Sequence, residues 1–189
     1  MAILPIVITG DPVLHRPASP VTEVTDEVRR LVSDMYETMD EAPGVGLAAP
    51  QVGVGLRIFV YSYEDDEGEP WRGVVINPEL WITPPVPGDP DEDEEVEGCL
   101  SVPGERFALR RSERAIVTGT DLEGAPVRIE VDGWRARILQ HEFDHLNGTL
   151  YVDRLTHPDD RDELEEIVAE QGWGKPGLSW LPGRDNLEG

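Results

Sequence analysis

The sequence is short of cysteine, of lysine and of long apolar runs. Cys99 is the single cysteine among 189 residues, so the chain cannot form an internal disulfide, and a reducing compartment is expected. No apolar run approaches the roughly 20 residues that a transmembrane helix needs. Met1 to Ile8 is apolar, but it lacks a basic start and contains Pro5, so we interpret it as a first strand rather than a signal peptide. These absences favour a cytoplasmic protein with no membrane association.

Basic residues are scarce as well. The chain has 16 Lys and Arg against 39 Asp and Glu, a formal net charge of −23, which argues against direct binding to nucleic acid or to an anionic membrane. The length fits a single domain, residues 1–189, with one sizeable core. Two segments differ from the rest. A proline-rich acidic loop at 84–96 is expected to be solvated, and a tail at 173–189 is expected to wrap the body without forming an element.

Apolar periodicity predicts three helices, one near each end of the chain and one between them. Thr25 to Glu41 begins with a capping threonine, and Pro158 to about Gln171 is strongly acidic and stops at Gly172. The middle helix covers Trp134 to Gly148. β-Branched and aromatic residues predict strands at 57–63, 73–82, 114–121, 126–131 and 150–152, with an acidic turn at 64–69. The predicted fold is therefore α+β, with mostly antiparallel strands around a central helix.

The central helix carries the motif H-E-x-x-H. His141 and His145 are four residues apart, so on a helix both imidazoles lie on one face and can reach a single metal ion. Glu142 then lies beside that ion, where a base acting on metal-bound water is needed. An exposed polar helix is the alternative interpretation of the motif alone, so a third metal ligand has to decide between them.

Two sources of a third ligand remain after one is excluded by spacing. The protease extension H-E-x-x-H-x-x-G-x-x-H fails, because Tyr151 occupies the position of the third histidine. In another class of zinc endopeptidase the ligand is a glutamate from a later helix, for which Glu165 or Glu166 would serve. Cys99, between two glycine-containing turns, would as a thiolate join the two imidazoles and leave a fourth position open for water.

A closed, non-catalytic metal site is a further alternative. It would make the chain an acidic interaction protein whose metal only holds the fold, and it needs a fourth protein ligand. The remaining histidines, His15 and His157, both lie next to proline-containing turns, where exposed histidines are expected.

Three separated blocks of sequence favour the catalytic alternative. They are GVGLAAPQ at 44–51, EGCLS at 97–101 and QHEFDHLNG at 140–148. Together and in this order they resemble the signature motifs of the peptide deformylases, and the tail at 172–183 resembles extended C-termini of some members. The resemblance implies hydrolytic removal of the N-formyl group from the formylmethionine of newly made polypeptides, with release of formate.

The resemblance also implies the metal site and the reaction at it. Cys99, His141 and His145 would hold one ion, natively Fe²⁺, with Zn²⁺, Ni²⁺ or Co²⁺ as substitutes in relatives. Sulfur and imidazole ligands alone would have indicated zinc. Metal-bound hydroxide would attack the formyl carbon, with Glu142 as general acid and base. The side-chain amide of Gln51 and the backbone N–H of Leu100 would stabilise the oxyanion.

Contacts with the peptide substrate follow from the same resemblance. Gly46 and Gly98 would bind the peptide backbone as an added strand, and Arg111 would lie near the substrate main chain. Candidates for an apolar methionine pocket are Val45, Leu100, Trp134 and Ile138. Arg137 stands where an apolar residue is often found, and it either turns outward or pairs with Glu97. Asp144 is either an orienting residue beside the ligands or a solvent-facing charge.

The predicted C-terminal helix departs from the family in one respect. Some relatives use a basic helix against ribosomal RNA, whereas this helix is acidic, so counterion release cannot drive such an association. We expect any transient contact with the ribosome to use another surface.

Overall fold

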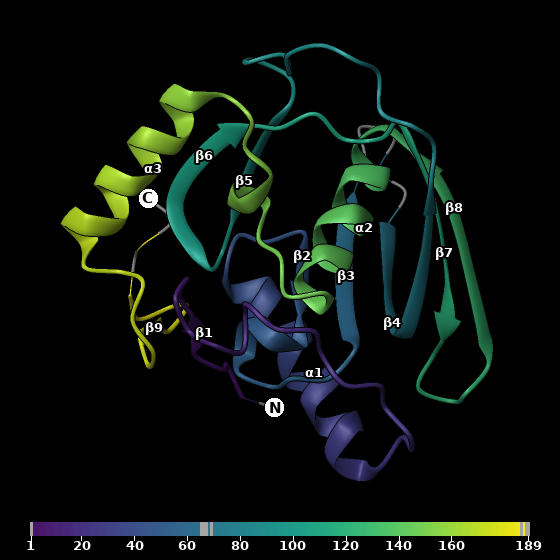
Figure 1. Cartoon of the computed structure of the whole chain (residues 1–189). Helices are drawn as coiled ribbons and strands as arrows, with labels where there is room; N and C mark the ends of the chain where they lie inside the picture. The colour runs from purple at the N-terminus through teal and green to yellow at the C-terminus, as the bar shows by residue number, and fades with distance from the viewer. Residues whose placement is uncertain (1, 65–67, 69, 186, 188–189) are drawn as a thin grey trace.

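The computed structural model in Figure 1 is built on one five-stranded antiparallel sheet with the strand order β2-β3-β4-β7-β8. Its strands are β2 (Gly46–Ala48), β3 (Ile58–Glu64), β4 (Pro70–Ile82), β7 (Arg114–Thr120) and β8 (Pro126–Asp132). The other strands are β5 (Val96–Cys99) paired with β6 (Val102–Ala108), and β1 (Ile6–Val7) paired with β9 (Ser179–Trp180). The helices are α1 (Asp26–Glu41), α2 (Gly133–Leu146) and α3 (Pro158–Gln171), with 3-10 turns η1 (Ala49–Val52) and η2 (Tyr151–Arg154). The structure describes residues 2–64, 68, 70–185 and 187.

Strand β3 explains how the sheet positions both of its covering helices. Side chains alternate between the two faces of a strand, and all four residues from Ile58 to Tyr61 are buried. Ile58 and Val60 pack into a core shared with the inner face of α1. Phe59 and Tyr61 pack into a second core shared with α2. The sheet therefore lies between α1 and α2, and the predicted α+β fold with antiparallel strands is confirmed.

The predicted signals at the ends of the outer helices are present. The side-chain hydroxyl of Thr25 accepts a hydrogen bond from the Val28 N–H at 3.4 Å, which caps α1. Helix α3 ends at Gly172, whose φ of +68° is in the left-handed region that favours glycine. None of the helices in the described part of the chain combines the length and apolar character that a bilayer crossing requires.

The segment predicted as a strand at 150–152 instead enters the 3-10 helix η2, which contains Tyr151 and Val152, so that prediction was wrong. The Asp153 carboxylate accepts a hydrogen bond from the Leu150 N–H at 2.7 Å, and η2 follows directly. A side chain that bonds to the backbone of a nearby residue in this way competes with strand pairing.

The C-terminal tail forms an element, contrary to expectation. Its residues Ser179 and Trp180 make β9, which pairs with Val7 and Ile6 of β1. The indole N–H of Trp180 is buried and donates to the carbonyl of Leu100 at 2.8 Å. The tail is thus bonded directly to the segment that follows Cys99.

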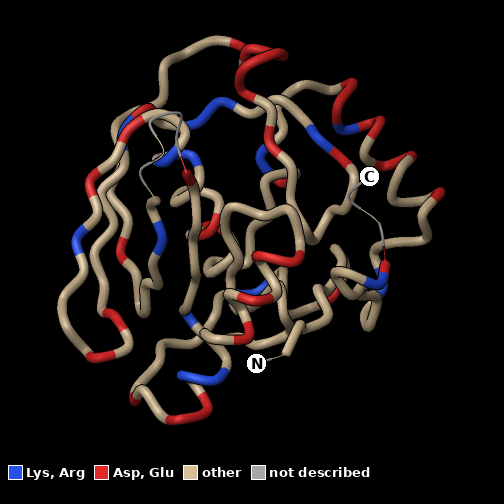
Figure 2. Tube along the Cα trace, turned by 180° about the vertical axis from the view of Figure 1, so that it is seen from behind, with Lys and Arg blue, Asp and Glu red and all other residues tan. Residues whose placement is uncertain are grey.

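The acidic loop is mostly exposed, but it is anchored. Figure 2 shows acidic residues along this loop and along α3. Arg110 donates to the Asp89 carbonyl at 2.5 Å and to the Glu95 carboxylate at 2.8 Å. The exposed character ends before Glu97, which is buried in β5. Residues 65–67 and 69 of the turn predicted at 64–69 lie outside the described residues.

Candidate metal centre and active site

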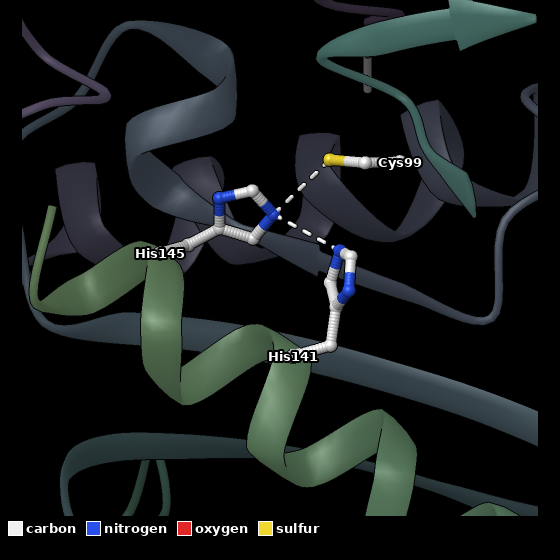
Figure 3. Close-up of side chains that lie close together, drawn as sticks. All are labelled: Cys99, His141 and His145. Atoms are coloured by element: carbon white, nitrogen blue, oxygen red, sulfur yellow. Dashed lines mark hydrogen bonds between the residues drawn. The ribbon is translucent and has the colours of Figure 1, made fainter. Parts of the chain in front are cut away.

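Three side chains from two distant parts of the chain converge in Figure 3. The Nε2 atom of His145 lies 3.4 Å from the Cys99 sulfur and 3.2 Å from the Nε2 atom of His141. The three donor atoms all lie within 4.8 Å of one another. Among the described residues this is the one group of histidine, cysteine and carboxylate side chains that meets this spacing. Glu165 and Glu166 are exposed on α3, and both His15 and His157 are exposed as predicted.

Local structure explains how the three ligands are aimed. His141 and His145 are one turn apart on α2, so their rings project from the same face. Cys99 ends β5, where the pairing of β5 with β6 shifts register between Gly98 and Cys99. A register irregularity of this kind redirects a side chain that regular pleating would place elsewhere.

The donor set fits a metal ion of the transition series. A thiolate and two neutral imidazoles are typical ligands of Zn²⁺ and of redox-active first-row metals. Burial lowers the pKa of His145 well below its usual value, which keeps this imidazole neutral, as ligation requires. Two of the ligands, Cys99 and His141, lie in the wall of a cavity of about 180 Å³, so a fourth position faces open space.

Glu142 lies in the wall of the same cavity with one oxygen available. Its side chain is buried, and its Oε2 atom has no hydrogen-bond partner among the described residues. Burial raises the pKa of Glu142 to about 7, with the negative charge of Glu97 contributing in the same direction. A carboxyl group poised near neutral pH can both accept and donate a proton.

Gln51 is held by the backbone of its own turn. Its side-chain oxygen accepts a hydrogen bond from the Ala48 N–H at 2.8 Å, which fixes the orientation of the amide. Its side-chain nitrogen then points at the Cys99 sulfur, 3.7 Å away. Leu100, the other predicted oxyanion donor, lines the same cavity, and its carbonyl is tied to Trp180.

The residues predicted to contact substrate fall into two groups. Six of them line the cavity with Cys99 and His141: Val45, Gly46, Gly98, Leu100, Trp134 and Ile138. Arg111 is not among the residues that line it, so its predicted place beside the substrate stays a prediction. Its guanidinium is buried and bonds to the carboxylates of Glu97 and Asp144. Arg106, which sequence reasoning missed, lines the cavity instead, opposite Gly98 in the β5–β6 hairpin.

Glu97 lies at the centre of the charged side chains behind Cys99, His141 and His145. One of its oxygens lies 3.1 Å from His141 Nδ1, the ring nitrogen that faces away from the other two ligands. Burial opposes its ionisation, but hydrogen bonds from His141 and Arg111 and the charge of Arg111 hold the pKa of Glu97 well below its usual range. An ionised Glu97 fixes the orientation and tautomer of the His141 ring.

The structure resolves the two alternatives left open for neighbouring charges. Arg137 does not turn outward, because its guanidinium donates to Glu97 at 2.7 Å. Asp144 is buried and not solvent-facing: it accepts from Arg111 at 2.5 Å and from Arg154 at 2.6 Å. Both side chains therefore support the helix that carries the two histidines.

Comparison with known proteins adds independent evidence. The family model described as Polypeptide deformylase matches residues 3–161. The chain is 53% identical to a peptide deformylase of Rhodococcus opacus over 187 residues, covering 97% of this chain and 95% of that protein. It is also 53% identical over 190 residues to one of Mycobacterium marinum, covering 97% and 96%.

Solved structures agree. The peptide deformylase of Thermus thermophilus superposes with a TM-score of 0.75 at 42% identity, covering 89% of this chain and 95% of that one. That of Ehrlichia chaffeensis in complex with actinonin gives a TM-score of 0.78 at 36% identity, covering 90% and 99%.

Proposed function

The chain belongs to the polypeptide deformylase family, and we propose that its active site is the centre formed by Cys99, His141, His145 and Glu142. The protein is a metal-dependent hydrolase that removes the formyl group from N-formylmethionine at the start of a polypeptide. The observation that carries the assignment of the site is the convergence of Cys99 with both histidines beside the free oxygen of Glu142.

The three donor atoms would hold one metal ion, for which we propose Fe²⁺ as the native ion and Zn²⁺, Ni²⁺ or Co²⁺ as substitutes. When bound, such an ion polarises the formyl oxygen and lowers the pKa of a coordinated water molecule. The donor chemistry and the mutual distances of Cys99, His141 and His145 support this assignment.

Glu142 is the proton carrier of the proposed mechanism. Its Oε2 atom accepts a proton from the attacking water and delivers it to the amine nitrogen as the formyl C–N bond breaks. Two properties support this role: the free oxygen and the pKa of about 7. A positively charged ion beside it would lower that pKa and favour the carboxylate before the proton is taken up.

Gln51 and Leu100 stabilise the negative charge that develops on the formyl oxygen. The amide of Gln51 is already oriented by Ala48, and Trp180 donates to the Leu100 carbonyl, in the peptide that follows the Leu100 N–H. Donors fixed before the reaction cost no reorganisation when the charge appears, which is why removal of one such donor typically lowers kcat by about 10²–10³.

The peptide would bind along the free edge of β2. This strand is at one end of the sheet order, so the side of Gly46 away from β3 can pair with an added strand. Gly98 borders the opposite side of the cavity, and the methionine side chain would contact Val45, Leu100, Trp134 and Ile138. Val45 and Trp134 are 37% and 40% exposed, so their apolar surfaces are free for this contact.

The proposed natural substrates are nascent chains in the cytoplasm, where formylated polypeptides are made. Helix α3 is an unsuitable surface for ribosomal RNA, because seven of its residues are acidic: Asp159, Asp160, Asp162, Glu163, Glu165, Glu166 and Glu170. Arg161 is its single basic residue. A transient ribosome contact would therefore use another face.

Two substitutions test the proposed site. Cys99→Ala should lose the metal and with it formate release from formyl-Met peptides. An endopeptidase with Glu165 or Glu166 as metal ligand would instead keep both its metal and its peptidase activity after this change. Glu142→Gln should keep the metal but release formate at least ~10²-fold more slowly. Full activity of Glu142→Gln would instead fit a metal site that only holds the fold, and it would refute the proposal.

A further inference from the structure

The metal ligands come from two elements that are joined by little backbone packing. Helix α2 packs against the five-stranded sheet, chiefly on β2, β3 and β7, whereas the main neighbour of β5 outside its own hairpin is η2. His141 and His145 therefore belong to the sheet side of the molecule and Cys99 to the hairpin side. Something other than backbone packing has to fix the distance between the helix and the hairpin.

Arg137 spans that gap. It lies on α2 one turn before His141, and its side chain is only 10% exposed. Its Nη1 atom donates to the Glu97 carboxylate at 2.7 Å and to the Leu109 carbonyl at 2.7 Å. The carbonyl of Glu95 lies 3.4 Å from the same atom, and the Glu95 carboxylate lies 3.5 Å from Nη2. All of these acceptors belong to the β5–β6 hairpin or to the residues that directly flank it.

The bond to Glu97 links both halves of the metal centre. Glu97 is two residues before Cys99 on β5, and its other oxygen lies 3.1 Å from His141 Nδ1. A shift of Glu97 would move the strand that carries the thiolate and would also release the His141 ring. The guanidinium of Arg137 opposes that shift from the helix side, because its Nη1 atom bonds to two hairpin acceptors at once.

We infer that Arg137 is a positioning residue that clamps the β5–β6 hairpin to α2 and so keeps Cys99 in reach of the metal that His141 and His145 hold. This inference rests on the proposed function of the centre. It predicts that Arg137 controls how firmly the metal is retained and how fast the reaction runs, although the side chain bonds to none of the three ligands.

Arg137 can be removed without the penalty that Arg111 would carry. Arg111 is the buried partner of two carboxylates, Glu97 and Asp144, and its loss would leave uncompensated charge in the interior. After loss of Arg137, Glu97 still has Arg111 as its partner. The change therefore removes the contacts of Arg137 with the hairpin, leaves the link from Glu97 through Arg111 to Asp144, and keeps the core charge paired.

The test uses Arg137→Met, which keeps an unbranched chain of similar length, and Arg135→Met as the matched control. Arg135 is on the same helix but only partly buried, with its guanidinium over the Trp71 ring, so the control has the same charge change outside the centre. Each protein is loaded with Co²⁺. The rate of Co²⁺ transfer to a chelator, the thiolate-to-cobalt absorption band and the separate kcat and KM for a formyl-Met tripeptide are then measured.

Arg137→Met should release Co²⁺ about 10-fold to 100-fold faster than wild type, with an altered thiolate band. Its kcat should fall by a similar factor and by more than KM changes, although Arg137 also lines the cavity with its guanidinium 5.9 Å from the centre of the Trp134 ring. Arg135→Met should match wild type in every measurement. Release of Co²⁺ and kcat at control values in Arg137→Met would overturn the inference, as would a raised KM with unchanged kcat, which would make Arg137 a substrate contact.

If Arg137→Met does not fold, Arg137→Lys replaces it, because a lysine ammonium keeps the charge but not the planar fork. Faster metal release is again expected, and release at the wild-type rate would overturn the inference. Failure of the proposed function is separate: a wild-type protein that neither binds Co²⁺ through Cys99 nor releases formate refutes the site itself.

Discussion

Gly46 provides a sharp test of where the catalytic carboxylate lies. A Cβ atom added at Gly46 would be 2.2 Å from the Oε1 atom of Glu142 and 2.6 Å from its carboxyl carbon. Ordinary contact begins at 3.4 Å, so the carboxylate would have to move by about 1.2 Å. Gly46→Ala should therefore displace Glu142 from the position in which it takes the proton from water.

The size of the effect follows from that displacement. Misplacement of a reacting group by about 1 Å costs roughly 10²-fold in rate, or about 3 kcal/mol of transition-state stabilisation. Backbone strain would not contribute to the loss of activity, because Gly46 does not have a positive φ. An alanine there reduces the entropy of the unfolded chain, which offsets part of the overpacking cost of about 1–3 kcal/mol. The variant should stay folded with kcat about 100-fold lower.

The assay is formate release from a formyl-Met tripeptide, together with thermal unfolding and metal content. Gly55→Ala is the control, because its added Cβ would meet only Val13, at 3.9 Å, and Gly55 also lacks a positive φ. In a Glu142→Asp background the carboxylate is one methylene shorter, so adding Gly46→Ala should cost less than about tenfold. A folded, metal-loaded Gly46→Ala protein with kcat within about twofold of Gly55→Ala would refute the reasoning.

Three further predictions concern metal removal, the tail and acid stability. Chelation of the metal should stop formate release reversibly without changing the circular dichroism spectrum. The cores on both sides of the sheet are held by apolar packing that does not depend on the ion. Global unfolding on chelation would contradict this prediction. Trp180→Phe should lower the free energy of unfolding by about 1–3 kcal/mol, because the Leu100 carbonyl loses its buried donor. Trp81→Phe, at an exposed site, should leave the free energy of unfolding unchanged. Urea titration measures both variants. The pKa of Glu97 is held below its ordinary 4.5, so the stability that Glu97 contributes is present above that pH and is lost as the pH falls. Metal-free Glu97→Gln should therefore lose less stability than metal-free wild type between about pH 5 and about pH 3. Equal losses would contradict the ion pairs of Glu97.

The regular elements of the fold could be predicted because their signals are local. The period of apolar residues and the capping Thr25 define α1, and alternation with a polar turn defines the β7–β8 hairpin. Short strands gave no such signal. β2 is three residues of Gly, Leu and Ala, and β9 is two residues, so each exists only because a distant partner strand pairs with it.

The convergence of Cys99 with His141 and His145 could be predicted because spacing on a helix and a single cysteine left few choices. The charges behind them could not. Glu97 ends a run of acidic residues and looks like one more solvated carboxylate, yet it is buried, because Arg111 and Arg137 compensate its charge. The ion pairs of Arg111 could not be predicted for the same reason: the sequence shows that an arginine is present but does not show which carboxylates fold around it.

Arg106 was missed because its position depends on pairing within a hairpin that the sequence did not reveal. Only the register of β5 against β6 places it opposite Gly98 at the cavity. When a strand pair is not predicted, the residues whose roles depend on their cross-strand neighbours cannot be predicted either.

The central claim is that Cys99, His141 and His145 hold one metal ion that is required for deformylation. The most direct measurement is metal content and formate release on one anaerobically purified sample, compared across fractions with different metal occupancy. We expect one metal per chain at saturation, formate release in proportion to occupancy, and loss of both in Cys99→Ala. Formate release by metal-free protein, or full occupancy and activity in Cys99→Ala, would contradict it.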